Sequence, residues 1–245
     1  MGAVRSRLRR WHVWLGWVVG LPVLFWVVSG LVMVIKPIDE VRGEDLLAEP
    51  APVRMALPPV PPAIGGVPLK SLKLEQRAAG PRWVIAMARG PTRLADPANG
   101  ALLPPLSAAD AVREVTARYT GRAKVQSAAR TDPAKPPLEF RRPVVAWQVA
   151  MDDGTHFYVD ASTGEVLARR TRWWRFYDWM WGLHIMDLKT REDTHNPLII
   201  GFAIASLVMA LLALVLLPLT TRSRRRRGKP KSPGNGGSEP IRENR

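Results

Sequence analysis

The residues of this 245-residue sequence that could do chemistry are first of all its four histidines. A neutral imidazole nitrogen can ligate a metal or a haem iron, and imidazole can also carry a proton. His12, His184 and His195 flank long apolar stretches, and these three are the candidate cofactor ligands. His156 begins a short alternating stretch, and we expect it to be an ordinary surface residue of a strand.

Other catalytic patterns are missing from the sequence. It has no cysteine, which excludes disulfides, thiolate zinc sites, iron–sulfur clusters and a C-x-x-C-H haem attachment. The patterns G-x-G-x-x-G, G-x-x-x-x-G-K, G-x-S-x-G and H-E-x-x-H do not occur either. We therefore expect no autonomous enzyme, and the sequence predicts no metal site.

Two long stretches without a charged residue, 11–35 and 197–219, stand near the two ends. As helices they span roughly 37 and 34 Å, which is enough to cross a hydrocarbon core of about 30 Å. The sequence predicts transmembrane helices over 11–36 and 196–219. The first is longer than the apolar part of a signal peptide and is followed by no A-x-A site, so we expect an uncleaved signal anchor.

The net charge of +15 is concentrated beside these two stretches. Arginines crowd residues 1–10, and a second basic cluster begins at Arg222. By the positive-inside rule, both termini are cytoplasmic and the middle of the chain is periplasmic, in a bacterial inner membrane. Because the positive charge lies beside the apolar stretches, it indicates membrane topology, and nucleic-acid binding is not expected. The tail over 220–245 is expected to be disordered and basic.

Small residues form a face on each predicted span. Gly16 and Gly20 give G-x-x-x-G in the first, and Gly201 and Ala205 lie on one face of the second. Small residues let membrane helices approach closely. We expect the spans to pack on each other, in a homodimer, or against another membrane subunit.

The central part of the chain contains a repeat. After a proline-rich periplasmic spacer over 37–68, Trp83, Met87, Gly90, Asp96, Gly100 and Leu103 recur 64 positions later as Trp147, Met151, Gly154, Asp160, Gly164 and Leu167. Each copy reads as a β-hairpin with a short third strand. Only the copy over 107–170 has a helix before it, with Ser107 as cap and Asp110 in the capping-box position, so the copy over 69–106 is degenerate. The fold class is α+β, a helix packed on an antiparallel sheet between two transmembrane helices.

The stretch Trp147 to Leu167, with Val-Asp-Ala-Ser-Thr-Gly-Glu-Val at 159–166, resembles the PepSY domain. Its motif residues here are Asp160, Thr163, Gly164 and Glu165. Arg9 to Gly16, Ser29-Gly30 and Leu183-His184 look like the PepSY-associated transmembrane family. The resemblance extends over nearly the whole chain to about residue 220. Larger relatives have four or more helices and include ferric-siderophore reductases with haem between histidines, whereas this chain has two helices.

The resemblance leaves two functions open. One is a non-enzymatic, membrane-anchored PepSY module that binds an unknown periplasmic protein or ligand, regulating a protease or serving a metal-uptake system. The other is a subunit with b-type haem, for transmembrane electron transfer or ferric iron reduction. His12 is expected opposite His184 and His195, so one haem would need His184 with His195, or the same histidine from two chains.

The Trp-rich segment 171–195 also has two interpretations. It can lie in the membrane interface, where tryptophan rings are favoured. It can also form an aromatic wall against a flat cofactor or a quinone.

Overall fold

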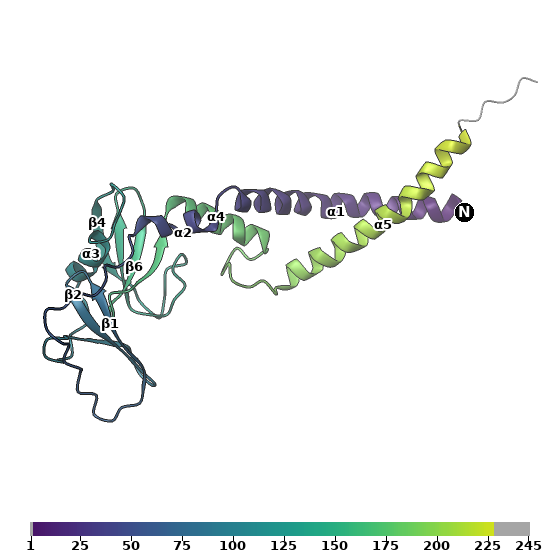
Figure 1. The fold of residues 1–245 in the computed structure, drawn as a ribbon. Coiled ribbons are helices and arrows are strands. Elements are labelled where there is room, and N and C mark those ends of the chain that lie inside the picture. Colours follow the sequence, from purple (N-terminus) through teal and green to yellow (C-terminus); the bar gives the residue numbers. More distant parts are fainter. Residues whose placement is uncertain (1, 228–245) are drawn as a thin grey trace, which may run out of the picture. The chain divides into compact units, whose positions relative to one another are not determined.

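The computed structural model describes residues 2–227, and its contacts divide the chain into two compact units. One unit is formed by residues 1–27 together with 195–245, and the other by residues 28–194. The elements combine helices with two antiparallel sheets, so the predicted α+β class is confirmed (Figure 1). The predicted tail lies outside the described residues from residue 228 onward.

Two long helices carry the apolar stretches, α1 (Gly2–Val34) and α5 (Pro197–Arg227). Their segments Ala3–Val34 and Pro197–Pro218 are long and apolar enough to cross a membrane. Helix α1 already includes the basic cluster expected as a separate N-terminal segment, since residues 2–10 hold no proline and a single glycine. The predicted start of α5 is confirmed, because Asn196 Oδ1 accepts the Ile199 N–H at 3.1 Å and Pro197 occupies the first turn.

The second repeat is a four-stranded sheet with a helix on one face (Figure 1). Its strands follow in chain order: β4 (Val125–Arg130), β5 (Ala146–Met151), β6 (His156–Asp160) and β7 (Val166–Arg170). Helix α3 (Ala108–Thr116) begins at the predicted capping box of Ser107 and Asp110. Its buried Ala111 and Val115 pack on Val149 and Phe157 of the sheet. This apolar layer is the main core of unit 28–194.

The first repeat is a three-stranded sheet made of β1 (Leu69–Arg77), β2 (Gly80–Met87) and β3 (Arg93–Ala95). Its register matches that of the second repeat at the predicted offset of 64. Trp83 pairs with Ala95 and Ile85 with Arg93, just as Trp147 pairs with Val159 and Val149 with Phe157. The predicted duplication of the hairpin is confirmed.

The turn after the third strand is also duplicated. Asp96 N–H donates to the Ala101 carbonyl at 2.8 Å and Gly100 N–H to the Asp96 carbonyl at 2.7 Å. The bonds Asp160 N–H to Glu165 at 2.8 Å and Gly164 N–H to Asp160 at 2.9 Å repeat this pattern. The two copies therefore share backbone geometry beyond their sequence similarity.

The proline-rich segment takes the place of the missing helix in the first repeat. Val60 N–H donates to the Pro97 carbonyl, and the Val60 carbonyl accepts the indole N–H of Trp83, both at 2.8 Å. In the second repeat, Leu106 makes the same two contacts with Ala161 and Trp147. The segment expected as a spacer is thus packed against the sheet, because extended proline-rich backbone leaves carbonyls free to accept.

The beginning of the predicted spacer is folded as well. Short helices α2 (Ile38–Arg42) and η1 (Glu44–Leu46) follow α1, and Leu47 is buried in the core of the second repeat. Helix α4 (Arg172–His184) follows β7, and Thr171 caps it by accepting the Trp174 N–H at 2.9 Å. Phe140, stacked on Tyr158 with ring centroids 4.3 Å apart, belongs to a second, smaller core.

Candidate functional site

The residues of the PepSY motif build a tight turn. Asp160 Oδ1 accepts the N–H groups of Ser162 at 2.7 Å and Thr163 at 2.9 Å, and Thr163 Oγ1 accepts the Glu165 N–H at 3.3 Å. Gly164 has φ of +71°, which favours glycine. The buried motif residues Thr163 and Gly164 therefore fix the backbone conformation of this turn.

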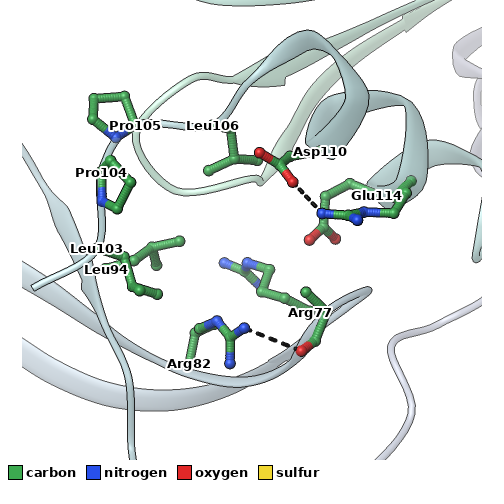
Figure 2. A pocket seen from close by; sticks show the side chains of 11 residues that line it. Arg77, Arg82, Leu94, Leu103, Pro104, Pro105, Leu106, Asp110 and Glu114 are labelled. Atoms are coloured by element: carbon green, nitrogen blue, oxygen red, sulfur yellow. Dashed lines mark hydrogen bonds and ion pairs between the residues drawn. The ribbon is translucent and has the colours of Figure 1, made fainter. Parts of the chain in front are cut away.

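This turn contacts residues that line a recess between the two repeats, and Figure 2 shows the recess. A Cβ added to Gly164 would lie 3.1 Å from Leu106 Cδ2, 3.4 Å from Glu114 Cγ and 3.5 Å from Arg77 Cδ, three residues that line the recess. In Figure 2, Arg77 and Arg82 of the β1–β2 hairpin face Asp110 and Glu114 of α3 across the opening. The volume is about 180 Å³. That is smaller than the roughly 300–1,000 Å³ of small-molecule pockets, so the recess suits one side chain or one chain end.

The wall of the recess combines apolar and charged groups. The apolar part consists of Leu94, Leu103, Pro104, Pro105 and Leu106. Both carboxylates are engaged by the protein: Asp110 pairs with Arg113 and accepts the Ser107 N–H at 2.9 Å, and Glu114 accepts the Ala78 N–H with both oxygens at 3.1 Å. Burial raises the pKa of Glu114, against the effects of the Ala78 N–H and of Arg77.

The arginines of the recess differ in their partners. Arg77 donates to the Thr163 carbonyl at 2.8 Å and pairs with Glu75 at 2.8 Å. Arg82 donates to the carbonyls of Pro81 at 2.8 Å and Ala79 at 3.1 Å, and it forms no ion pair within residues 2–227. Arg82 is half-buried and lies opposite Glu75 in the β1–β2 register, and its charge also acts on Glu114, but neither carboxylate forms an ion pair with it.

A longer groove runs along the same face of the β1–β2 hairpin. Ser71, Lys73 and Glu75 of β1 alternate with residues of the other face, and they pair across with Ala86, Val84 and Arg82. The groove has a volume of about 570 Å³, and its opposite side includes Asp160, Ser162, Thr163 and Glu165 of the motif turn. The motif turn thus borders the groove on one side and the recess on the other.

His184 contacts the end of α1. Its Nδ1 is hydrogen-bonded to Ser29 Oγ at 3.1 Å, and Ser29 is only 1% exposed. A Cβ added to Gly30 would lie 3.3 Å from His184 Cε1, so glycine lets the ring lie close to the helix. The structure therefore brings together Ser29-Gly30 and His184, which are 155 positions apart.

The other predicted site residues belong to the other unit. His12 is half-buried in α1, and its Nδ1 is buried with no hydrogen-bond partner among the described residues. His195 is exposed just before α5. A Cβ added to Gly16, Gly20 or Gly201 would meet no described atom within 4 Å, and Ala205 is half-buried. The packing role of these small residues stays a prediction.

A half-buried polar cluster lies on the sheet face opposite α3. Glu139 Oε1 accepts the Tyr158 hydroxyl at 2.6 Å and is 2.6 Å from His156 Nδ1, while Arg175 pairs with Oε2 at 3.1 Å. Gln148 donates to the Tyr158 hydroxyl at 2.7 Å. The expectation that His156 is an ordinary surface residue is wrong, because the 131–145 loop folds over it.

A second buried group ties α4 in place. Asp178, with its side chain 5% exposed, accepts from Arg141 at 2.7 and 2.6 Å and from Arg191 at 2.7 Å. Both arginines have positive φ, 57° and 58°, a strained region for side chains larger than glycine. Sequence reasoning missed this group and the recess alike, because their members are distant in the chain and fall in no motif.

The folded elements define the class of protein: an α+β domain between two helices of membrane-spanning length and hydropathy. The sequence model of one family, the PepSY-associated TM region, matches residues 9–234, and the chain belongs to that family. No curated protein and no solved structure matches the chain. The predicted resemblance to the PepSY-associated transmembrane family is thereby confirmed, and the chain is a membrane-associated protein of the PepSY type.

Proposed function

We propose that this chain is a membrane-anchored, non-enzymatic binding module, whose duplicated PepSY-like part holds a ligand or partner on the periplasmic side. The observation that carries the proposal is the position of the motif turn. Thr163 and Gly164 separate a recess and a groove that open between the two repeats. A turn that served stability alone could be placed anywhere on the sheet, whereas this one shapes the concave surface.

The polar groups of this surface support binding rather than catalysis. Asp110 and Glu114 are held by hydrogen bonds from the protein, and Arg77 is paired with Glu75. A nucleophile with an adjacent base, the usual arrangement for covalent catalysis, does not occur among the described residues that line the recess. What these residues offer is an apolar wall with a cation at its edge.

Photo-crosslinking tests the proposal in cells. The photoreactive amino acid p-benzoylphenylalanine is placed at Lys73, an exposed groove residue of β1, and at Lys135, an exposed residue of the loop between β4 and β5. We expect irradiation to add mass to the purified protein at Lys73 and not at Lys135, as read by intact-mass spectrometry. If Lys73 gives no adduct, or no more than Lys135 gives, the binding function is wrong.

A second candidate function is electron transfer through a b-type haem, and the contact of His184 with Ser29 favours it. Haem-ligating histidines are commonly oriented by a hydrogen bond to the other ring nitrogen. Residues 28–194 hold one further histidine, His156, which is engaged with Glu139. A second axial ligand would therefore come from His12, from His195 or from a second copy of the chain. A bound haem would supply one-electron redox chemistry.

Absorption spectra test this candidate. The protein is purified in mild detergent from haem-replete cells, and spectra are recorded before and after dithionite. A Soret band that His184→Ala removes and His156→Gln retains supports haem ligation by His184. Absence of a Soret band in the unchanged protein rules out the electron-transfer function and leaves the binding function in place.

A further inference from the structure

The ligand class follows from three properties of the recess and the groove, provided that this surface is the binding site proposed above. They are the guanidinium of Arg82, which forms no ion pair among the described residues, the apolar wall beside it, and the groove along the same face of the hairpin. We infer that the site binds the carboxyl-terminal end of a peptide in extended conformation, with its last side chain apolar and its terminal carboxylate on Arg82.

The charge requirement comes from Arg82. Its guanidinium donates to two backbone carbonyls and forms no ion pair among the described residues, and its remaining N–H groups can bind an incoming carboxylate. Neither carboxylate across the recess forms an ion pair with Arg82: Asp110 is paired with Arg113, and Glu114 accepts the Ala78 N–H with both oxygens while the charge of Arg82 acts on it at longer range. An incoming carboxylate makes charge-assisted hydrogen bonds to a guanidinium, and these are stronger than bonds between neutral groups.

The apolar requirement comes from the wall opposite the charges. Leu94 is 5% exposed, and Leu103 and Leu106 are half-buried beside it. A volume of about 180 Å³ holds one side chain of the size of leucine together with the carboxylate. It does not hold a flat cofactor as large as haem.

The groove favours a peptide over a small carboxylic acid. Its floor runs along β1 from Ser71 to Glu75, about 13 Å at the rise of an extended strand, and Arg77 and Arg82 of the recess continue that face. A free acid would leave this length unused, whereas about four extended residues would fill it. Lys73, Glu75, Asp160 and Glu165 line the groove and provide polar partners of both signs.

Peptide binding to the full chain in lipid nanodiscs tests the inference. The probe is a fluorescein-labelled pentapeptide, Gly-Ser-Ala-Ala-Leu, prepared as the free acid and as the carboxyl-terminal amide, and anisotropy gives the Kd. We expect the free acid to bind about tenfold tighter than the amide or better. We expect a peptide with lysine at its end to bind more weakly than the one with leucine.

Two variants locate the contact. Arg82→Gln should abolish the difference between acid and amide, and Arg122→Gln, which removes an exposed arginine outside the recess, should retain it. Equal affinities of acid and amide in the unchanged chain, or a difference that survives Arg82→Gln, would overturn the inference. Hexanoate that displaces the peptide with the affinity of the peptide itself would overturn the peptide assignment. If Lys73 gives a crosslink but the free-acid and amide peptides bind with equal affinity, the binding function stands and only the recognition of a terminal carboxylate is refuted.

Discussion

Asp178 shows how a single buried carboxylate holds an element in this fold. It accepts hydrogen bonds from Arg141, in the loop before β5, and from Arg191, in the loop after α4. Both arginines are less than a fifth exposed and have strained backbones. The carboxylate therefore offsets two desolvated positive charges and stabilises the loops that present them.

We expect Asp178→Asn to lower the free energy of unfolding by about 3 kcal/mol, because it leaves two partly buried guanidiniums without a counter-charge. Chemical denaturation in detergent, followed by tryptophan fluorescence, measures the change. Asp39→Asn, at an exposed aspartate of α2, is the control and should stay within about 0.5 kcal/mol. Equal effects of the two substitutions would contradict the role of Asp178.

Glu139 makes stability depend on pH. Burial raises its pKa, but hydrogen bonds from Tyr158 and His156 together with the charge of Arg175 outweigh burial, and the net pKa is lowered. The pKa of Tyr158 is raised, first by burial and then by its bond to Glu139, so Tyr158 stays a donor. The folded protein therefore stabilises the ionised form of the Glu139 carboxylate.

Because the folded-state pKa of Glu139 lies below its unfolded value, its contribution is complete above the unfolded value of about 4.3. It is lost as pH falls through the folded pKa. We expect Glu139→Gln to destabilise the protein at pH 7 and to have progressively less effect at acidic pH. Thermal unfolding between pH 3 and 7 measures this. Glu49→Gln, an exposed glutamate, should show no such trend, and a pH-independent effect of Glu139→Gln would refute the linkage.

At the scale of elements, the duplicated turn decides how each sheet meets its neighbour. Gly164 touches the α3 side of the recess, and Gly100 touches the proline-rich segment, where an added Cβ would lie 2.8 Å from the Pro61 carbonyl oxygen. The same turn therefore accepts a helix in one copy and an extended segment in the other. The glycine of this turn lets the neighbouring segment approach closely, whether that segment is a helix or an extended chain.

Alanine substitutions at Gly90 and Gly164 separate the cost of backbone strain from the cost of close approach. Gly90 has φ of +99° with no described atom within 4 Å of an added Cβ, so Gly90→Ala should cost only the left-handed strain, about 1–2 kcal/mol. Gly164→Ala adds a contact at 3.1 Å with Leu106, and we expect at least about 1 kcal/mol more. Denaturant titration compares them. Equal costs would show that the Leu106 side chain gives way freely.

At the scale of the whole molecule, the basic clusters predict where each segment lies. Arginines precede and follow the two apolar segments, so both termini should be cytoplasmic and residues 37–195 periplasmic. The natural absence of cysteine makes this simple to test, because any introduced thiol is the sole target of a maleimide.

We expect Lys135→Cys to react with a membrane-impermeant maleimide in intact spheroplasts, and Ser6→Cys to react only after the membrane is permeabilised. A reporter fused after Arg222 should likewise behave as cytoplasmic. Reaction of Ser6→Cys in intact spheroplasts would reverse the predicted orientation of the first helix.

The sequence by itself determined the local features of this protein. Two uncharged stretches predict the long helices, the offset of 64 predicts the paired hairpins, and Ser107 with Asp110 predicts where α3 begins. Each of these depends on residues close together in the chain or on a repeated pattern. Periodicity and capping act over a few residues and can be read directly.

Only the tertiary structure decided which distant residues meet. The contact of Ser29 with His184, the pairing of Asp178 with Arg141 and Arg191, and the recess between Arg82 and Leu94 join residues from separate elements. His156 was misassigned for the same reason, since Glu139, which contacts its ring, belongs to a loop outside its own strand. Such contacts depend on how the sheet, α3 and α4 pack, and packing leaves no short-range pattern in the sequence.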